Sequence, residues 1–105
     1  MSAFKAVAKV SELKPGEKKG VRFGLSHLLL TNVDGNFYAV GGRCTHWRLS
    51  LIDGNLEGRI ITCPHHGSQF DVTTGKVLQG PATKPLPTFQ IKVEGDDVLV
   101  GKRSA

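Results

Sequence analysis

Two short segments of the chain carry side chains that bind metals. The first is Cys44-Thr45-His46 and the second is Cys63-Pro64-His65-His66-Gly67. Each segment offers a thiolate and an imidazole, and both of these groups are metal ligands. Between them lie the sixteen residues from Trp47 to Thr62, enough for a loop out and a strand back. The spacing predicts two loops that close on one metal centre from opposite sides.

Three interpretations of these two cysteines and two histidines compete: a disulfide, a zinc site and a two-iron cluster. A disulfide would leave the histidines unexplained, and the chain shows no export signal of the kind that accompanies structural disulfides. A tetrahedral zinc site is chemically reasonable, but zinc motifs usually group two cysteines in one segment and two histidines in the other. In a two-iron cluster, one iron takes both sulfurs and the other takes both nitrogens. Mixed segments favour the cluster, because each loop then touches both irons.

The two segments, extended by Ser68 and followed by Gly80-Pro81-Ala82, resemble the Rieske ferredoxins and related Rieske domains. The resemblance covers nearly the whole chain. It implies a [2Fe–2S] cluster bound by Cys44 and Cys63 through sulfur and by His46 and His66 through nitrogen. It also implies three antiparallel sheets, with a cluster-binding subdomain at one end and both ligand histidines near the surface.

The resemblance also bears on the surroundings of the cluster. Ser68 lies where family members place a hydroxyl that donates to a bridging sulfide and raises the reduction potential. Phe70 lies where high-potential respiratory members carry a tyrosine that donates to a cysteine sulfur. Leu49 and His65 occupy the positions of the respiratory disulfide, so packing and hydrogen bonds must hold the loops together. Because the donor at Ser68 is kept and the donor at Phe70 is lost, we expect a reduction potential below that of the respiratory class.

The elements that position these loops are short, β-rich runs separated by Gly, Pro, Asn and Asp. Strands are predicted over 4–10, 21–23, 27–31, 36–40, 88–93 and 98–101. Inside the section rich in Cys, His and Gly, residues 59–62 are the only clear strand before Phe70. The predicted fold is all-β, either a sandwich or a partly open barrel, with a loop-rich cluster-binding subdomain. We expect one domain over 1–105, with a base of 1–41 and 76–105 and a cluster-binding part of about 42–75.

Composition sets the remaining limits. Hydrophobic residues form 39% of the 105 residues, and no apolar run approaches the length of a membrane helix. The net charge is +5, but the basic residues are scattered among acids and do not form a patch typical of nucleic-acid binding. We expect a soluble, cytoplasmic protein that binds neither membranes nor nucleic acids.

The chain shows no nucleophile paired with a base and no phosphate-binding loop, so no catalytic residue is predicted. The leading prediction is a soluble Rieske-type ferredoxin that carries single electrons from a reductase to an oxygenase or other redox enzyme. Docking is expected near His46, His66 and Trp47. One alternative is a Rieske-like small subunit of a larger enzyme, such as a nitrite reductase. The other is a zinc-binding structural module.

Overall fold

The computed structural model describes residues 4–46 and 48–104. Within these residues the protein is built from antiparallel strands and one short 3-10 helix, which confirms the predicted all-β class. The elements are β1 (Lys5–Lys9), η1 (Val10–Glu12), β2 (Lys18–Phe23), β3 (Ser26–Val33), β4 (Asn36–Gly41), β5 (Asn55–Glu57), β6 (Ile60–Thr62), β7 (Gln69–Asp71), β8 (Val77–Gln79), β9 (Thr88–Glu94) and β10 (Asp97–Arg103).

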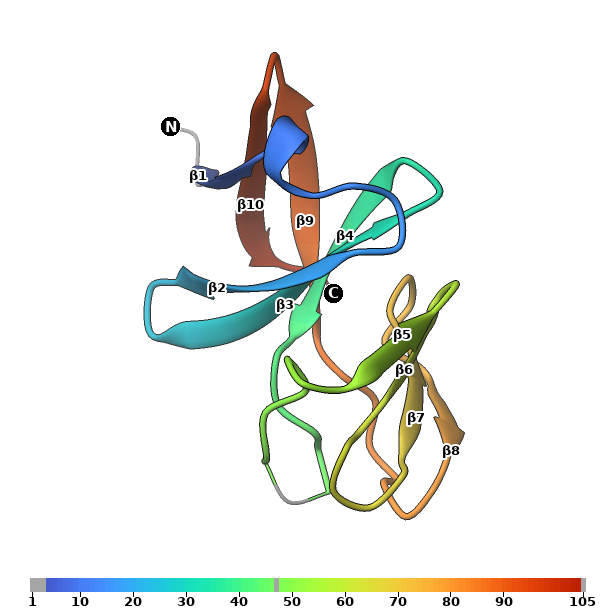
Figure 1. Ribbon diagram of the computed structural model, residues 1–105. Helices are drawn as coiled ribbons and strands as arrows, with labels where there is room; N and C mark the ends of the chain where they lie inside the picture. Colours follow the sequence, from blue (N-terminus) through green and yellow to red (C-terminus); the bar gives the residue numbers. More distant parts are fainter. Residues whose placement is uncertain (1–3, 47, 105) are drawn as a thin grey trace.

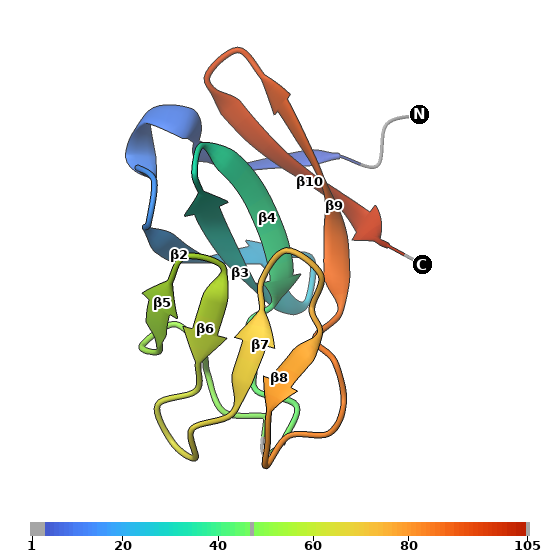
Figure 2. The same cartoon turned by 90° about the vertical axis from the view of Figure 1, so that its right-hand side faces the viewer.

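The strands form two sheets. The larger sheet has six strands in the order β1-β10-β9-β4-β3-β2, and its two edge strands approach each other, so that it is nearly closed as a barrel. The smaller sheet has the order β5-β6-β7-β8 and lies beside β3 and β4 (Figures 1 and 2). The loops before β5, between β6 and β7, and between β8 and β9 gather at one end of the molecule.

Strand β3 explains how the two sheets share a core. Its residues Leu28, Leu29 and Leu30 are all buried, although neighbouring side chains of a strand point to opposite faces. Leu28 and Leu30 pack in the core of the six-stranded sheet, whereas Leu29 packs in the core that contains Cys44 and Cys63. A continuous apolar run is therefore required here, because both faces of this strand are covered.

Two expectations about the sheets are wrong. The residues that the structure describes form two sheets instead of three. The section between 42 and 75 also contains more strand than expected, because β5 precedes β6 and pairs with it. Asn55, Leu56 and Glu57 show weak β-propensity, so this strand depends on its partner more than on its own composition. The smaller sheet also continues to Gln79, past residue 75.

The sequence Asp34-Gly35 is typical of hairpins, and these two residues form the turn between β3 and β4. Both residues have positive φ angles, 52° and 92°, as the tight turn between β3 and β4 requires. The side chain of Asn32 supports the turn by accepting a hydrogen bond from the Gly35 N–H. This hairpin sets the register that pairs Leu29 with Val40 beneath the smaller sheet.

In the described part of the chain, no helix is long and apolar enough to cross a bilayer.

Candidate metal centre

The two predicted metal-binding loops have the same backbone pattern. The N–H of Cys44 donates to the carbonyl of Leu49, and the N–H of Arg48 donates back to the carbonyl of Cys44, at 2.7 and 2.6 Å. In the second loop, the N–H of Cys63 donates to the carbonyl of Ser68, at 2.8 Å. The N–H of Gly67 donates to the carbonyl of Cys63, at 3.2 Å. Each cysteine is therefore held at the base of a tight, closed loop.

The fifth residue of each loop has a left-handed backbone. Gly67 has a φ of 77° and Arg48 a φ of 56°. Glycine adopts this conformation without a steric penalty, whereas an arginine pays roughly 1 kcal/mol for it. The two loops therefore have the same left-handed backbone at this position, although one carries an arginine and the other a glycine. This conformation of Arg48 could not be predicted from its residue type, because arginine is not a typical turn residue.

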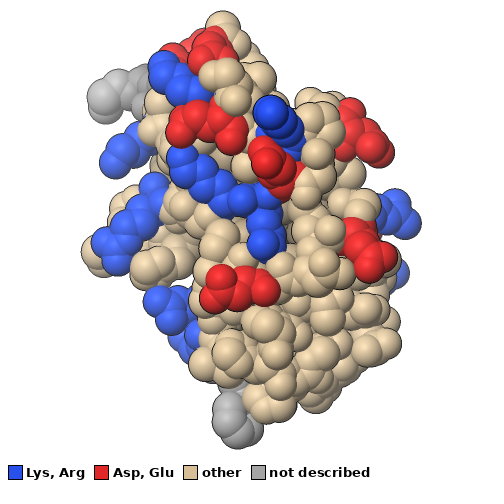
Figure 3. All heavy atoms as spheres, viewed as in Figure 1, with Lys and Arg blue, Asp and Glu red and all other residues tan. Residues whose placement is uncertain are grey.

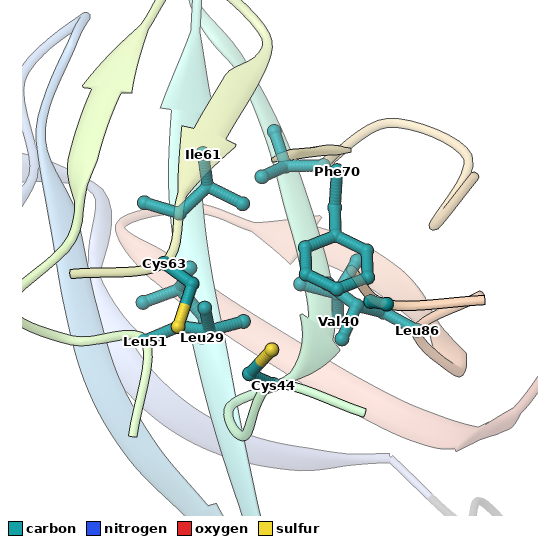
Figure 4. Close-up of a cluster of buried hydrophobic side chains, with 10 residues drawn as sticks. Leu29, Val40, Cys44, Leu51, Ile61, Cys63, Phe70 and Leu86 are labelled. Atoms are coloured by element: carbon teal, nitrogen blue, oxygen red, sulfur yellow. The ribbon is translucent and has the colours of Figure 1, made fainter. Parts of the chain in front are cut away.

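The cysteines and histidines of the loops point in different directions. Cys44 and Cys63 are each only 2% exposed and belong to the core beneath the smaller sheet. Figure 4 shows their sulfur atoms directed into the space between the two loops. His46 is partly buried and His66 is exposed, and their ring centroids lie 5.2 Å apart at an interplanar angle of 89°. The predicted surface position is confirmed for His66, whereas His46 is partly buried.

The four side chains are therefore arranged as two pairs, namely two buried thiols and two imidazoles that lie against each other nearer the surface. Among residues 4–46 and 48–104, no group of three or more His, Cys, Asp or Glu side chains is placed to hold one metal ion. A Rieske centre needs such pairs, because its inner iron takes two thiolates and its outer iron takes two imidazoles. The two thiols and two imidazoles, and the way they are paired, fit a Rieske [2Fe–2S] cluster.

A third segment, 80–87, connects the two loops. The hydroxyl of Thr45 donates to the carbonyl of Lys84 at 2.6 Å, and the N–H of Ala82 donates to the hydroxyl oxygen of Ser68 at 3.0 Å. Leu86 from the same segment is buried in the core with both cysteines. The expectation that packing and hydrogen bonds hold these loops, at positions where respiratory relatives use a disulfide, agrees with these contacts. The sequence did not predict Thr45 and Lys84 as partners, although the proline-rich composition marks the segment as stiff.

The two predicted neighbours of the centre are both buried. Ser68 is 0% exposed and accepts from Ala82, so its own hydroxyl proton can be donated to another group. Phe70 is also 0% exposed and packs in the same core as the two cysteines (Figure 4). His65, the neighbour of His66, is exposed. Trp47 lies outside the described residues.

Comparisons with known proteins agree with this geometry. The family model of the Rieske [2Fe-2S] domain matches residues 3–90. The ferredoxin component of a naphthalene 1,2-dioxygenase system from Pseudomonas aeruginosa is 40% identical over 89 residues, covering 85% of this chain and 86% of the relative. The biphenyl dioxygenase ferredoxin subunit of Pseudomonas sp. (strain KKS102) is 40% identical over 98 residues, covering 92% and 90%.

A solved structure has the same fold. It is the complex of reduced oxygenase and oxidized ferredoxin in carbazole 1,9a-dioxygenase, and the similar chain superposes with a TM-score of 0.92. The sequence identity is 34%, and the match covers 100% of this chain and 99% of that one.

The all-β fold, together with two loops that each carry a cysteine and a histidine, is that of an iron–sulfur protein. The chain belongs to the Rieske [2Fe-2S] domain family, as the match over residues 3–90 shows. Its cofactor is a [2Fe–2S] cluster, and its relatives are ferredoxin components of aromatic dioxygenase systems. The protein is an electron carrier and not itself a catalyst, which confirms the function predicted from the sequence.

Proposed function

We propose that Cys44 and Cys63 bind the inner iron of the cluster through sulfur, and that His46 and His66 bind the outer iron through nitrogen. The observation that carries this proposal is the division of the four side chains into a buried pair of thiols and a pair of adjacent imidazoles, of which His66 is exposed. When bound, the cluster supplies one reversible electron-accepting site. The protein surrounds its sulfur side with apolar groups and leaves its histidine side near the surface.

The types of the proposed ligands and the residues around them both affect the reduction potential of the cluster. Two neutral imidazoles replace two thiolates, so the centre carries less negative charge and is reduced more easily. We propose that the hydroxyl of Ser68, oriented by the Ala82 N–H, donates to a bridging sulfide and stabilises the added electron further. Phe70 cannot donate a hydrogen bond, so the matching contribution of a tyrosine is missing.

A matched pair of variants tests the ligand assignment. His65 and His66 are consecutive, exposed residues of one loop, so neither substitution removes a buried apolar side chain. We expect His66→Ala to abolish the red-brown chromophore and lower the iron content to less than about a tenth of the wild-type value, since a missing ligand leaves one iron underbound. His65→Ala should keep two irons and the wild-type spectrum. A chromophore that survives in His66→Ala, or is lost in both variants, would contradict the assignment.

We further propose that the protein receives single electrons from a reductase and delivers them to the oxygenase of an aromatic-ring dioxygenase system. The names of the similar proteins support this role, because they are ferredoxin components of such systems. The imidazole side of the centre is the natural exit, since electron transfer needs a short path and His66 is exposed there. Docking is therefore proposed at the end of the molecule that carries His46 and His66.

Two other functions predicted as alternatives receive less support. The zinc-binding module disagrees with membership of a [2Fe–2S] family. A permanent subunit of a larger enzyme, such as a nitrite reductase, is not favoured by the named relatives, which are ferredoxins of dioxygenase systems and have nearly the same length as this chain. Turnover of the purified holoprotein with a separate reductase and oxygenase distinguishes a mobile carrier from a fixed subunit. A carrier shows rates that increase with its own concentration.

We propose that residues 1–105 act as one domain in the cytoplasm. The core around Leu29, which joins the smaller sheet to the six-stranded sheet, supports a single unit. The smaller sheet and segment 80–87 suggest that the cluster-binding part extends from about 42 to 87. A reducing compartment suits a protein whose two cysteines are needed as thiolates.

A further inference from the structure

A groove opens next to the first metal-binding loop. It has a volume of about 450 Å³ and runs from that loop past the turn between β2 and β3 to the end of β10. Its lining combines apolar and basic side chains, namely Leu25, His27, Arg43, Arg48, Phe89 and Arg103. We call this surface the basic groove. It shares Arg43, Thr45 and Arg48 with the loop that carries His46, so anything bound there lies beside the proposed electron exit.

Leu25 is an exposed apolar residue at the edge of the basic groove. It is 99% exposed and occupies the two-residue turn between β2 and β3, together with Gly24. Turn positions of this kind usually carry Gly, Asn or Asp, which satisfy the backbone geometry and are compatible with water. The fold gains no buried area from a leucine at this place. Its apolar surface is instead available to a partner.

Arg48 is the second unusual residue of the basic groove. Its φ of 56° matches that of Gly67 at the same position of the second loop, where glycine avoids the steric penalty. Keeping an arginine here costs roughly 1 kcal/mol, and such strain is concentrated at functional sites. The Arg48 side chain is exposed, so burial in the core does not offset the backbone strain.

The charge of the basic groove is not balanced by neighbouring acids. The described lining residues include three arginines and no aspartate or glutamate. In the described part of the chain, the ion pairs use Lys9, Lys19, Arg59 and Lys92, and none of these cations lines the basic groove. Figure 3 shows that the face over the smaller sheet is mostly uncharged and that Lys or Arg side chains lie at its left edge.

We propose that the basic groove is the docking site for an acidic surface segment of a redox partner protein. In this arrangement an apolar side chain of the partner packs against Leu25 and Phe89, and its carboxylates face Arg43, Arg48 and Arg103. The charge complementarity selects the partner, because like charges facing one another oppose association. The inference rests on the proposed function, and it adds the chemistry of the surface that the partner must present.

The experiment uses the oxidised holoprotein and two haem proteins of opposite charge, the acidic cytochrome b5 and the basic cytochrome c. Dissociation constants are measured by calorimetry at low ionic strength, where attraction between charges is least screened. We expect cytochrome b5 to bind and cytochrome c to bind at least about tenfold more weakly. Arg48→Glu and Arg103→Glu should each weaken binding of cytochrome b5 about tenfold, and Leu25→Ser about fivefold.

Lys102→Glu is the matched control. Lys102 is the exposed neighbour of Arg103 on β10 and does not line the basic groove, but its substitution changes the net charge by the same amount. We expect it to weaken binding less than about threefold. Equal losses in Lys102→Glu and Arg103→Glu would overturn the inference, because net charge alone would then explain binding. Absence of binding to cytochrome b5 overturns it as well, as does self-association that Leu25→Ser removes, which assigns the groove to a second copy.

Electron transfer is followed in the same mixtures, after reduction of the cluster, through the haem absorbance. This second readout separates the inference from the proposed function. Selective binding without reduction of the haem contradicts the carrier role but leaves the docking surface in place. Reduction at equal rates by wild type, Arg48→Glu and Arg103→Glu contradicts the docking surface but leaves the carrier role in place.

Discussion

At the scale of single residues, the centre is determined by which side chains face inward. Cys44 and Cys63 lie in an apolar core, and the imidazoles of His46 and His66 meet outside it. Around them, Ser68 offers a hydroxyl and Phe70 offers none. We therefore propose that the potential of the cluster depends on a few hydrogen-bond donors, so that single substitutions shift it without changing the ligands.

Phe70→Tyr tests this dependence. The new hydroxyl is placed in the core that contains both cysteines, and we expect it to donate to a cysteine sulfur there. A hydrogen bond worth about 1 kcal/mol more to the reduced than to the oxidised cluster raises a one-electron potential by roughly 40 mV. Protein-film voltammetry measures the change. Phe70→Leu, which adds no donor, is the control, and an unchanged or lowered potential in Phe70→Tyr would rule out this explanation.

At the scale of elements, segment 80–87 is the part that joins the two metal-binding loops. It contacts Thr45 in one loop and Ser68 in the other, and Leu86 anchors it in the core. Its path also depends on Gly75. The N–H of Leu86 donates to the carbonyl of Gly75 at 2.8 Å, and an added Cβ at Gly75 would collide with the carbonyl oxygen of Leu86.

Gly75→Ala should therefore displace this segment and weaken the centre. Gly75 has a φ of 79°, so alanine there suffers both backbone strain and a collision. Gly35→Ala is the matched control, because Gly35 has a φ of 92° and open space around its Cβ position. We expect the control to lower the melting temperature of the holoprotein by about 5 °C and Gly75→Ala to lower it by more than about 15 °C. Similar losses in the two variants would show that backbone strain alone matters.

At this scale, features that depend on neighbouring residues can be predicted from the sequence, and features that depend on distant contacts cannot. The ligand spacing and the Asp34-Gly35 turn were readable, because each depends on local chemistry at fixed intervals. Strand β5 was missed, since Asn55–Glu57 becomes a strand by pairing with β6 and not by its own propensity. The contact of Thr45 with Lys84 joins residues far apart in the chain, which spacing cannot reveal. The left-handed Arg48 was hidden for the opposite reason, because its residue type argues against its backbone conformation.

At the scale of the whole molecule, a nearly closed barrel carries the smaller sheet and the three loops at one end. The barrel places Leu29 beneath the sulfur side of the centre, and the loops present the histidine side outward. The basic groove lies next to the first of these loops. The proposed electron exit, the proposed docking surface and the proposed cluster ligands thus lie together at one end of a small protein.

The central claim is that two thiols and two imidazoles of this chain hold one two-iron cluster that takes up one electron. The most direct measurement is electron paramagnetic resonance before and after dithionite reduction, with iron and acid-labile sulfide counted on the same sample. We predict two irons and two sulfides per chain, no signal in the oxidised state, and one unpaired spin with an average g value below 2 after reduction. A protein that contains zinc, or iron without sulfide, and gives no signal on reduction would contradict the claim.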